Sequence, residues 1–335
     1  MRILLVHNYY QRAGGEDQVF RSESDLLREN GDDVREFVRE NRDIEAIPPV
    51  ALALNTIWGS RAAGELAAEI DRFRPDVLHV HNTFPLISPA IYWTAKDKGV
   101  PVVQTLHNFR LLCPQAMLLR RGVVCEDCVG RLPWRAVARK CYRDSVAETG
   151  VVAAMLTFHR AIRTYERRVT LFIALNAFCR DVFIRGGLPA EKIRVKANFV
   201  EDPGNGSAPK EAQFLYVGRL STEKGIRTLA GALEKTGGPA CEVIGTGPEE
   251  SQIVTARGVR FSGWRDGAYV RQRMFVSTAL VVPSIWYENF PRTIVEAFAC
   301  GLPVVASRIG ALASLIAEGN TGLLFEAGNA DDLAE

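Results

Sequence analysis

The sequence predicts an α/β protein of two domains, each built on a parallel sheet with helices on its faces. Three observations support this prediction. Short apolar runs typical of buried strands alternate with longer amphipathic runs typical of helices. Several apolar runs end in glycine turns that lead into a helix, as in Rossmann-like domains. The segment 201–210 is rich in Gly and Pro, interrupts the alternation and has the composition of a linker.

Length and composition agree with two domains. The chain has 335 residues, of which 47% are hydrophobic and 24% are charged, as in ordinary globular proteins. We place an N-terminal domain at 1–200, the linker at 201–210 and a C-terminal domain at 211–335. The net charge of +2 indicates no class of partner, and no apolar run approaches the length of a bilayer span. Because Met1–His7 is too short for a signal peptide, we expect a cytoplasmic protein.

The N-terminal domain begins as a Rossmann-like half. Arg2–His7 is predicted to be the first buried strand, and a helix is predicted from Glu16 to Glu29. Gly14 and Gly15 between them either let a ligand approach the helix N-terminus or form an ordinary tight turn. The turn lacks G-x-G-x-x-G, so a dinucleotide cofactor is not indicated.

The rest of this domain continues the alternation. Residues 47–70 contain loop and helix, without a clear assignment for 48–56. Two strands end in His81 and His107, at adjacent carboxyl ends of a parallel sheet, where ligands bind. Each histidine is as consistent with a structural role as with a functional one. The predicted strands are 34–38, 75–82, 100–106, 171–175 and 193–198, and the predicted helices are 88–98, 151–168 and 178–186.

An insertion at residues 110–145 departs from this pattern and contains four cysteines. They are Cys113, Cys125, Cys128 and Cys141. Four thiolates that include a Cys-x2-Cys pair could hold a structural zinc ion. They could instead form a disulfide or redox site, or remain reduced in the core. The pattern leaves these alternatives open.

The same insertion is basic, and few acidic residues lie near its cations in sequence. The cations are Arg120, Arg121, Arg131, Arg135, Arg139, Lys140 and Arg143. They form either a solvated charged face or a contact surface for an anionic acceptor, such as a lipid-linked phosphate, or for an anionic membrane. Aromatic residues do not alternate with the basic ones, so no nucleic-acid partner is expected.

The C-terminal domain opens with two strands that end in glycine turns. The strand at 214–217 is followed by Gly218, and the turn holds Arg219 and Lys224. Two cations at the carboxyl end of a strand can clamp a diphosphate without a metal ion. The strand at 241–244 leads into a turn that can accept a nucleoside, with glycines at Gly245 and Gly247. Farther along, Trp264 either stacks on a base or packs in the interior.

The stretch 279–301 carries the most informative pattern. An apolar run at 279–284 predicts a buried strand, and a short helix stopped by Gly301 follows it. Glu288 is then expected on the loop after the strand, and Glu296 about one turn into the helix. Carboxylates there can accept hydrogen bonds from sugar hydroxyls while the helix N-terminus holds a diphosphate. Two Glu at this spacing also fit a solvated face with one capping residue.

This stretch resembles the signature of retaining glycosyltransferases of family 4, which have the GT-B fold of two Rossmann-like domains facing a central crevice. The Glu-x7-Glu pattern is followed by Ala-Phe-Ala-Cys-Gly-Leu-Pro-Val-Val-Ala at 297–306. The resemblance is strong over 214–325 and weaker over 1–200. It implies a hexosyltransferase of polysaccharide biosynthesis that moves a sugar from a UDP- or GDP-sugar to a glycan or lipid-linked acceptor.

The resemblance also implies roles for individual residues. In the N-terminal, acceptor-binding domain, His107 would lie beside the donor sugar, and the Gly14–Gly15 loop would face donor and acceptor. In the C-terminal, donor-binding domain, Arg219 and Lys224 would hold the diphosphate. Glu288 would face the sugar and Glu296 would hold the ribose. The remaining donor-binding positions would be Gly218, Gly245, Gly247, Trp264, Asn289, Phe290 and Pro291.

The resemblance implies a reaction without a catalytic metal ion or cofactor. The sequence has no Asp-x-Asp, which holds a divalent ion in the other large class of glycosyltransferases. No residue presents itself as a nucleophile on the far face of the sugar, which favours a same-face mechanism. Family members usually continue beyond the helical pattern that starts at 331–335, so we expect either a truncated C-terminal domain or closing helices that are dispensable.

Two other functions stay open at this stage. A non-catalytic nucleotide-sugar-binding subunit would not need the intact set of Lys224, Glu288 and His107. A GT-B sugar-nucleotide epimerase would carry further acid and base groups near the sugar, and none stands out. The basic insertion adds peripheral contact with the inner face of a membrane to the expected cytoplasmic location.

Overall fold

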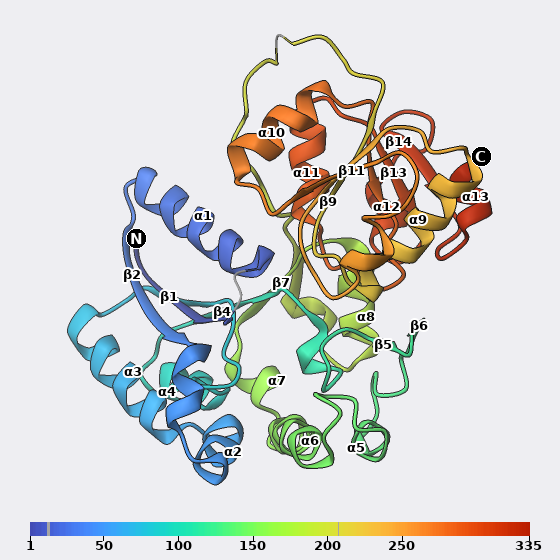
Figure 1. The fold of residues 1–335 in the computed structure, drawn as a ribbon. Helices are drawn as coiled ribbons and strands as arrows, with labels where there is room; N and C mark the ends of the chain where they lie inside the picture. The colour runs from blue at the N-terminus through green and yellow to red at the C-terminus, as the bar shows by residue number, and fades with distance from the viewer. Residues whose placement is uncertain (12–13, 207) are drawn as a thin grey trace. The chain divides into compact units, whose positions relative to one another are not determined.

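The computed structural model describes residues 1–11, 14–206 and 208–335. The chain divides into two units (Figure 1). The first comprises Met1–Met117 and Glu126–Ala197, and the second comprises Leu118–Cys125 and Asn198–Glu335. Each unit contains one six-stranded sheet, so the predicted class of two α/β domains with parallel sheets is confirmed. Residues 12–13 of the first turn and residue 207 of the predicted linker lie outside the described residues.

The first unit is built on a sheet with the order β2-β1-β3-β4-β7-β8, and every neighbouring pair is parallel. The strands are β1 (Arg2–Tyr9), β2 (Asp33–Glu40), β3 (Val77–Val80), β4 (Val102–Leu106), β7 (Leu171–Ala174) and β8 (Ile193–Val195). The strand order reverses between β1 and β3. In an open α/β sheet, ligands bind outside the carboxyl ends of the strands at such a reversal.

Helices cover both faces of this sheet, with α1 on one face and α3 and α4 on the other (Figure 1). Ile3 and Leu5 of β1 pack on Phe20 of α1, which fixes that helix over the sheet. The helices are α1 (Gly15–Glu29), α2 (Pro49–Ile57), α3 (Ser60–Phe73), α4 (Ala90–Asp97), α5 (Trp134–Ala138), α6 (Val146–Ala161), α7 (Thr164–Arg168) and α8 (Ala177–Arg185). Short 3-10 turns lie at η1 (Asn41–Ala46), η2 (Phe109–Leu111) and η3 (Ala190–Lys192).

The second unit has the strand order β11-β10-β9-β12-β13-β14, again parallel throughout. The order reverses between β9 and β12. The strands are β9 (Phe214–Val217), β10 (Cys241–Ile244), β11 (Val259–Gly263), β12 (Ala279–Val282), β13 (Val304–Ser307) and β14 (Gly322–Phe325). The helices are η4 (Thr222–Lys224), α9 (Ile226–Lys235), η5 (Glu250–Gln252), α10 (Gly267–Val276), α11 (Arg292–Ala299), α12 (Leu312–Leu315) and α13 (Ala330–Ala334). A small antiparallel hairpin, β5 (Leu119–Arg120) and β6 (Val123–Val124), also belongs to this unit.

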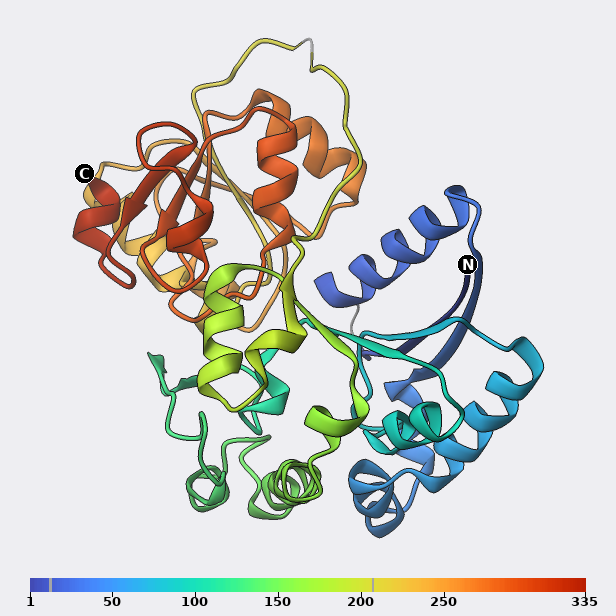
Figure 2. The same ribbon diagram turned by 180° about the vertical axis from the view of Figure 1, so that it is seen from behind.

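Both faces of the second sheet are buried, with α9 on one side and α10 and α11 on the other (Figure 1 and, from behind, Figure 2). Leu280 and Val282 of β12 belong to the core formed with Ile294 of α11. Val281 belongs to the opposite core, with Leu229 of α9. A strand covered on both faces needs apolar side chains at every position, which explains the continuous apolar run that predicted β12.

The structure corrects one predicted helix and completes another. The single helix expected at 151–168 is two helices, α6 and α7, separated where Arg163 adopts a left-handed φ of 58°. Helix α6 begins earlier than expected because Ser145 caps it, accepting a hydrogen bond from the Glu148 amide. Residues 49–57, which take in most of the unassigned stretch 48–56, form α2. Across residues 1–11, 14–206 and 208–335, no helix combines the length and apolar character that crossing a bilayer requires.

Candidate functional site

In the second unit, the strand reversal brings together a lysine and a glutamate. Lys224 closes the loop after β9, and Glu288 lies on the loop after β12. The Lys224 Nζ lies 2.6 Å from the Glu288 Oε1, and the Ser284 hydroxyl donates to the same oxygen at 2.7 Å. The Glu288 side chain is 7% exposed and that of Lys224 is 27% exposed. The carboxylate is therefore held from two sides, while the Lys224 side chain stays partly exposed.

Gly225 explains how the two loops approach each other so closely. Its φ is 72°, and a Cβ atom at this position would lie 1.7 Å from the Pro283 carbonyl oxygen. Only glycine fits this backbone conformation and this contact. The Ile285 amide also donates to the Glu223 carbonyl at 3.0 Å, which joins the loops directly. Lys224 and Glu288 are thus positioned by backbone contacts on either side of them.

The glycine turns after β9 and β10 pack backbone against backbone. Gly245 has a φ of 139°, and a Cβ atom there would lie 1.9 Å from the Gly218 carbonyl oxygen. A Cβ atom on Gly247 would lie 2.2 Å from the Leu220 carbonyl oxygen. These glycines leave the carboxyl ends of β9 and β10 without bulky side chains of their own. Glycine at 245 and 247 therefore lets the two turns come together at the carboxyl ends of β9 and β10, where ligands bind in open α/β sheets.

The other predicted donor-binding residues occupy varied environments. Trp264 is 74% exposed, so the alternative in which it packs in the interior is wrong. The Arg219 side chain is exposed, while its carbonyl accepts a hydrogen bond from the Tyr216 hydroxyl at 2.8 Å. Glu296 accepts from the Arg292 Nε at 2.8 Å, one turn earlier in α11. Asn289 is buried, Phe290 is half-buried, and Pro291 forms the N-cap of α11.

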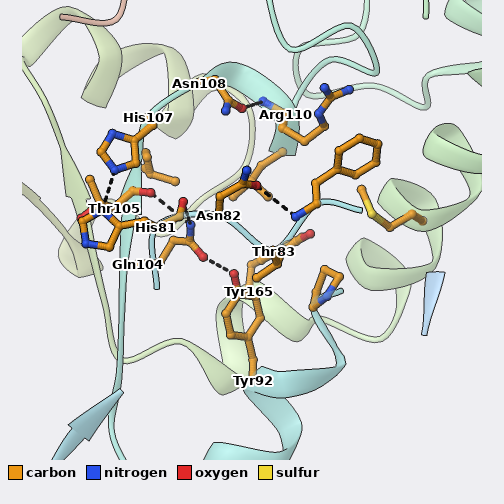
Figure 3. A pocket seen from close by; sticks show the side chains of 15 residues that line it. His81, Asn82, Thr83, Tyr92, Gln104, Thr105, His107, Asn108, Arg110 and Tyr165 are labelled. Atoms are coloured by element: carbon orange, nitrogen blue, oxygen red, sulfur yellow. Dashed lines mark hydrogen bonds between the residues drawn. The ribbon is translucent and has the colours of Figure 1, made fainter. Parts of the chain in front are cut away.

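In the first unit, His107 lies at the end of β4 beside a second histidine. The His81 Nδ1 and the His107 Nε2 lie 2.8 Å apart, with the rings stacked at 5.0 Å between centroids (Figure 3). Burial lowers the pKa of His107 from 6.5 to about 3 and also lowers the pKa of His81, so both rings are neutral near pH 7. The hydrogen bond between the two neutral rings therefore uses an N–H of one ring as the donor and a bare nitrogen of the other as the acceptor. A cavity of about 40 Å³, lined by these rings and by Asn108 and Arg110, opens beside them (Figure 3).

Glu23 of α1 lies next to His81, the second histidine of this pair. Its Oε2 is 3.7 Å from the His81 Nε2, and its Oε1 accepts from the Lys196 ammonium at 2.9 Å. Glu23, His79 and His81 are also the one group in the described part of the chain whose potential metal ligands lie within 4.8 Å of one another. Because Lys196 already supplies a positive charge to Glu23, the group is accounted for as an ion pair between a buried glutamate and an exposed lysine, with histidine neighbours.

The structure does not bring the predicted zinc ligands together. Within the described residues, Cys113, Cys125, Cys128 and Cys141 form no group with three sulfur atoms inside 4.8 Å. Cys125 belongs to the second unit and the other three belong to the first. All seven cysteines of the chain are present as thiols.

Glu16 is a candidate that sequence reasoning missed. Its Oε2 accepts hydrogen bonds from the Tyr10 hydroxyl and the Asn108 amide, both at 3.1 Å. Its Oε1 is buried without a hydrogen-bond partner among the described residues. Burial raises the pKa of Glu16 from 4.5 to about 8. The available signal was an acid directly after Gly14 and Gly15, which are both exposed at the N-terminus of α1.

Two family models together match nearly the whole chain. Residues 6–202 match the model described as Glycosyltransferase Family 4, and residues 199–335 match the model described as Glycosyl transferases group 1.

Curated proteins that are similar to this chain carry names of sugar-transferring enzymes. Sulfoquinovosyl transferase SQD2 of Arabidopsis thaliana is 25% identical over 290 residues, which cover 85% of this chain and 52% of that protein. A glycogen synthase of Mycobacterium tuberculosis is 26% identical, over 75% of this chain and 56% of that protein. D-inositol 3-phosphate glycosyltransferase of Actinosynnema mirum is 28% identical, over 82% of this chain and 66% of that protein. The chain thus spans about half the length of the first two relatives.

Solved structures show the same fold at low sequence identity. Anabaena Alr3699/HepE in complex with UDP is 18% identical, with a TM-score of 0.65 over 100% of this chain and 88% of that chain. Sucrose-phosphate synthase from Thermosynechococcus elongatus is also 18% identical, with a TM-score of 0.68 over 99% of this chain and 88% of that chain. These neighbours have the GT-B fold, so the GT-B prediction is confirmed.

Proposed function

We propose that this chain, which belongs to glycosyltransferase family 4, catalyses transfer of a sugar from a nucleoside-diphosphate sugar to an acceptor hydroxyl. The observation that carries the proposal is the Lys224–Glu288 contact of 2.6 Å at the strand reversal of the second unit. There, a partly exposed cation and an oriented carboxylate can meet the two ends of a sugar diphosphate. The neighbour Alr3699/HepE has been solved with UDP and with UDP-glucose, which supports a UDP-sugar donor.

In this proposal the cations act on the leaving group. Lys224 and Arg219 bind the diphosphate and stabilise the charge that grows on it as the bond to the sugar breaks. Because these cations meet that charge, the proposed reaction needs no metal ion. Glu288 accepts hydrogen bonds from the sugar hydroxyls, and Glu296 accepts them from the ribose. Gly218, Gly245 and Gly247 allow the nucleotide to approach the backbone, and Trp264, Asn289, Phe290 and Pro291 line its surroundings.

The bond changes keep the configuration at the anomeric carbon. The acceptor oxygen forms its bond on the same face from which the diphosphate oxygen departs. The proton of the acceptor hydroxyl passes to an oxygen of the leaving phosphate. The products are the glycoside and the nucleoside diphosphate, and no residue becomes covalently attached to the sugar. A glycosyl-enzyme intermediate trapped and identified by mass spectrometry would contradict this step.

The first unit is proposed to take part in the same reaction through His107. Its neutral imidazole can donate or accept a hydrogen bond but brings no charge near pH 7. His81 acts as a positioning residue, since its ring nitrogen lies 2.8 Å from that of His107. We assign acceptor binding to residues 1–200, including the Gly14–Gly15 turn, and donor binding to residues 211–335. The acceptor is a glycan or a lipid-linked sugar, with peripheral membrane contact through the basic insertion.

Release of nucleoside diphosphate tests this function. The protein is incubated with UDP-glucose, GDP-glucose or ADP-glucose, and free UDP, GDP or ADP is measured. We expect slow hydrolysis of one donor, reduced by about 10² or more in Glu288→Gln because a group that holds the sugar is lost. Glu318→Gln is the matched control, because this carboxylate of the same unit forms an exposed pair with Arg308. A non-catalytic nucleotide-sugar-binding subunit would bind a donor and release nothing.

A further inference from the structure

A second cavity in the first unit lies outside the site described above. It has a volume of about 300 Å³ and lies between η1, α2, the turn after β3 and α6. Its wall is mostly apolar and includes Ile44, Leu52, Ala53, Pro85, Val151 and Val152. Arg143 and Glu148 are the charged residues in its lining, and they pair with each other at 3.5 Å. The volume is in the range of ligand pockets, and the lining favours an apolar ligand.

This cavity shares a wall with the polar cavity at His107. Phe84 lines both cavities, whereas Tyr142 lines only the apolar one and Arg110 only the polar one. The Arg110 guanidinium lies 4.3 Å from the Phe84 ring centroid and 5.1 Å from that of Tyr142. Figure 3 shows Arg110 beside Asn108 at the polar cavity. A cation and an imidazole on one side, with an apolar cavity on the other, match the two ends of an amphiphile.

The helix that forms the outer wall of the cavity is apolar on its solvent side as well. Helix α2, Pro49–Ile57, has no charged residue in its sequence PVALALNTI. Val50 is 73% exposed and Leu54 is 65% exposed. Surface helices normally present polar residues to water, so an outward apolar row indicates contact with something other than water. The row extends the apolar surface from the cavity to the outside of the unit.

We propose that this cavity binds the hydrocarbon chain of a lipid-linked acceptor whose phosphate and sugar lie toward Arg110 and His107. The inference rests on the proposed glycosyltransfer and narrows its acceptor to the lipid-linked class. The two cavities lie on either side of the Phe84 side chain, which favours one amphiphilic ligand over two separate ligands. The exposed row on α2 gives the chain a path from a lipid phase without crossing a polar surface.

Binding of butyl, octyl and dodecyl phosphate, measured by titration calorimetry below their micelle concentrations, tests the inference. Each methylene that enters the cavity should tighten binding about fourfold, the factor that corresponds to about 0.8 kcal/mol per buried methylene. Ala53→Trp fills the cavity from α2, and Val151→Trp fills it from α6. In both variants the gain in affinity with chain length should disappear, while butyl phosphate binds as in the wild type.

Leu54→Asp is the matched control, because Leu54 lies on the same helix as Ala53 but outside the cavity lining. It should keep the chain-length dependence. Equal affinity of the wild type for butyl and dodecyl phosphate would overturn the proposal, as would unchanged dodecyl binding in both filled variants. If α2 only adsorbs to bilayers, phosphatidylcholine vesicles would bind the wild type and not Leu54→Asp, without any chain-length dependence in solution. The UDP-induced rise in unfolding midpoint is measured on every variant, so failure of donor binding is recognised separately.

Discussion

Lys224 and Glu288 pair with each other when no ligand is bound, and each can exchange that partner for a group of the ligand. Without a ligand, each charge satisfies the other, and Ser284 adds a hydrogen bond to the carboxylate. Glu288 therefore avoids the large cost of a buried, unpaired charge. In the proposed complex, the diphosphate replaces Glu288 at Lys224, and sugar hydroxyls replace Lys224 at Glu288. The pair would then favour a ligand that supplies both partners over inorganic phosphate, which supplies only one.

The raised pKa of the Glu16 carboxyl leads us to expect that the free energy of unfolding falls as the pH rises. Because burial raises the pKa of this carboxyl from 4.5 to about 8, the folded state holds a proton that the unfolded state releases between these values. The contribution is complete below about pH 4.5 and is lost as the pH rises through about 8. Glu16→Gln cannot ionise, so its unfolding midpoint relative to the wild type should rise from acidic to alkaline pH. Glu29→Gln, exposed at the end of the same helix, serves as control, and parallel behaviour of both variants would contradict the assignment.

A comparison of Gly225 with Gly301 distinguishes the cost of a left-handed backbone conformation from the cost of a close contact at the missing Cβ atom. Gly225 and Gly301 both have left-handed φ values, 72° and 65°, but only Gly225 faces a carbonyl oxygen at 1.7 Å from its added Cβ. Gly301→Ala should cost about 1–2 kcal/mol, the strain of one left-handed residue. Gly225→Ala should cost more and should also weaken UDP binding, because the loop that carries Lys224 must move. Urea unfolding measures both costs, and equal costs would show that the contact in the structure is not formed.

At the scale of elements, a buried glutamate joins a strand to a helix. Glu242 of β10 is fully buried and accepts hydrogen bonds from the Tyr269 hydroxyl at 2.8 Å and the Arg273 Nε at 2.6 Å, both on α10. Ser262 of β11 donates to the same carboxylate at 2.6 Å. Burial disfavours the charge, but these partners outweigh it and lower the pKa of Glu242. The packing of α10 against the sheet therefore depends on a satisfied charge.

Removing the arginine of this cluster should be costly. Arg273→Ala leaves Glu242 buried without its cation, and we expect a loss of about 3–5 kcal/mol of unfolding free energy. Arg308→Ala breaks an exposed pair with Glu318 in the same unit and should cost less than about 1 kcal/mol. Denaturant unfolding of both variants gives the comparison. Similar losses would mean that Glu242 is solvated or neutral in the folded protein.

The elements also show what the sequence could and could not predict. Strand β12 and helix α11 were predictable because an apolar run and a stop glycine bound them, and the position of Glu288 followed. The position of Lys224 followed from strand β9 and the glycine turn after it. Helix α2 was not, since its outward apolar residues remove the helical periodicity. The break between α6 and α7 carries no Gly or Pro to mark it. The burial of Glu16 and the pairing of His81 with His107 depend on contacts between separate strands and helices, which no local pattern encodes.

For the whole molecule, the two sheets follow the two common strand orders of open α/β folds. The first has the order of flavodoxin-like domains with a further strand, and the second has the order of dinucleotide-binding domains. In each unit the candidate residues lie at or next to the strand reversal: Glu16 and His81 near β1 and β3, and Lys224 and Glu288 after β9 and β12. His107 follows β4, one strand beyond the reversal of the first sheet. The same physical rule therefore locates the candidate residues of both units, although their side chains differ.

The central claim is that Lys224 helps to bind a nucleoside diphosphate, and thermal unfolding with UDP, GDP and ADP tests it most directly. A ligand that binds only the folded state at about 100 times its dissociation constant adds about 2.7 kcal/mol of stability. We predict that one of the three, with UDP favoured, raises the unfolding midpoint of the wild type and of Lys235→Ala, an exposed lysine of the same unit. The rise should be largely lost in Lys224→Ala. An equal rise in Lys224→Ala, or no rise with any nucleotide in the wild type, would contradict the account.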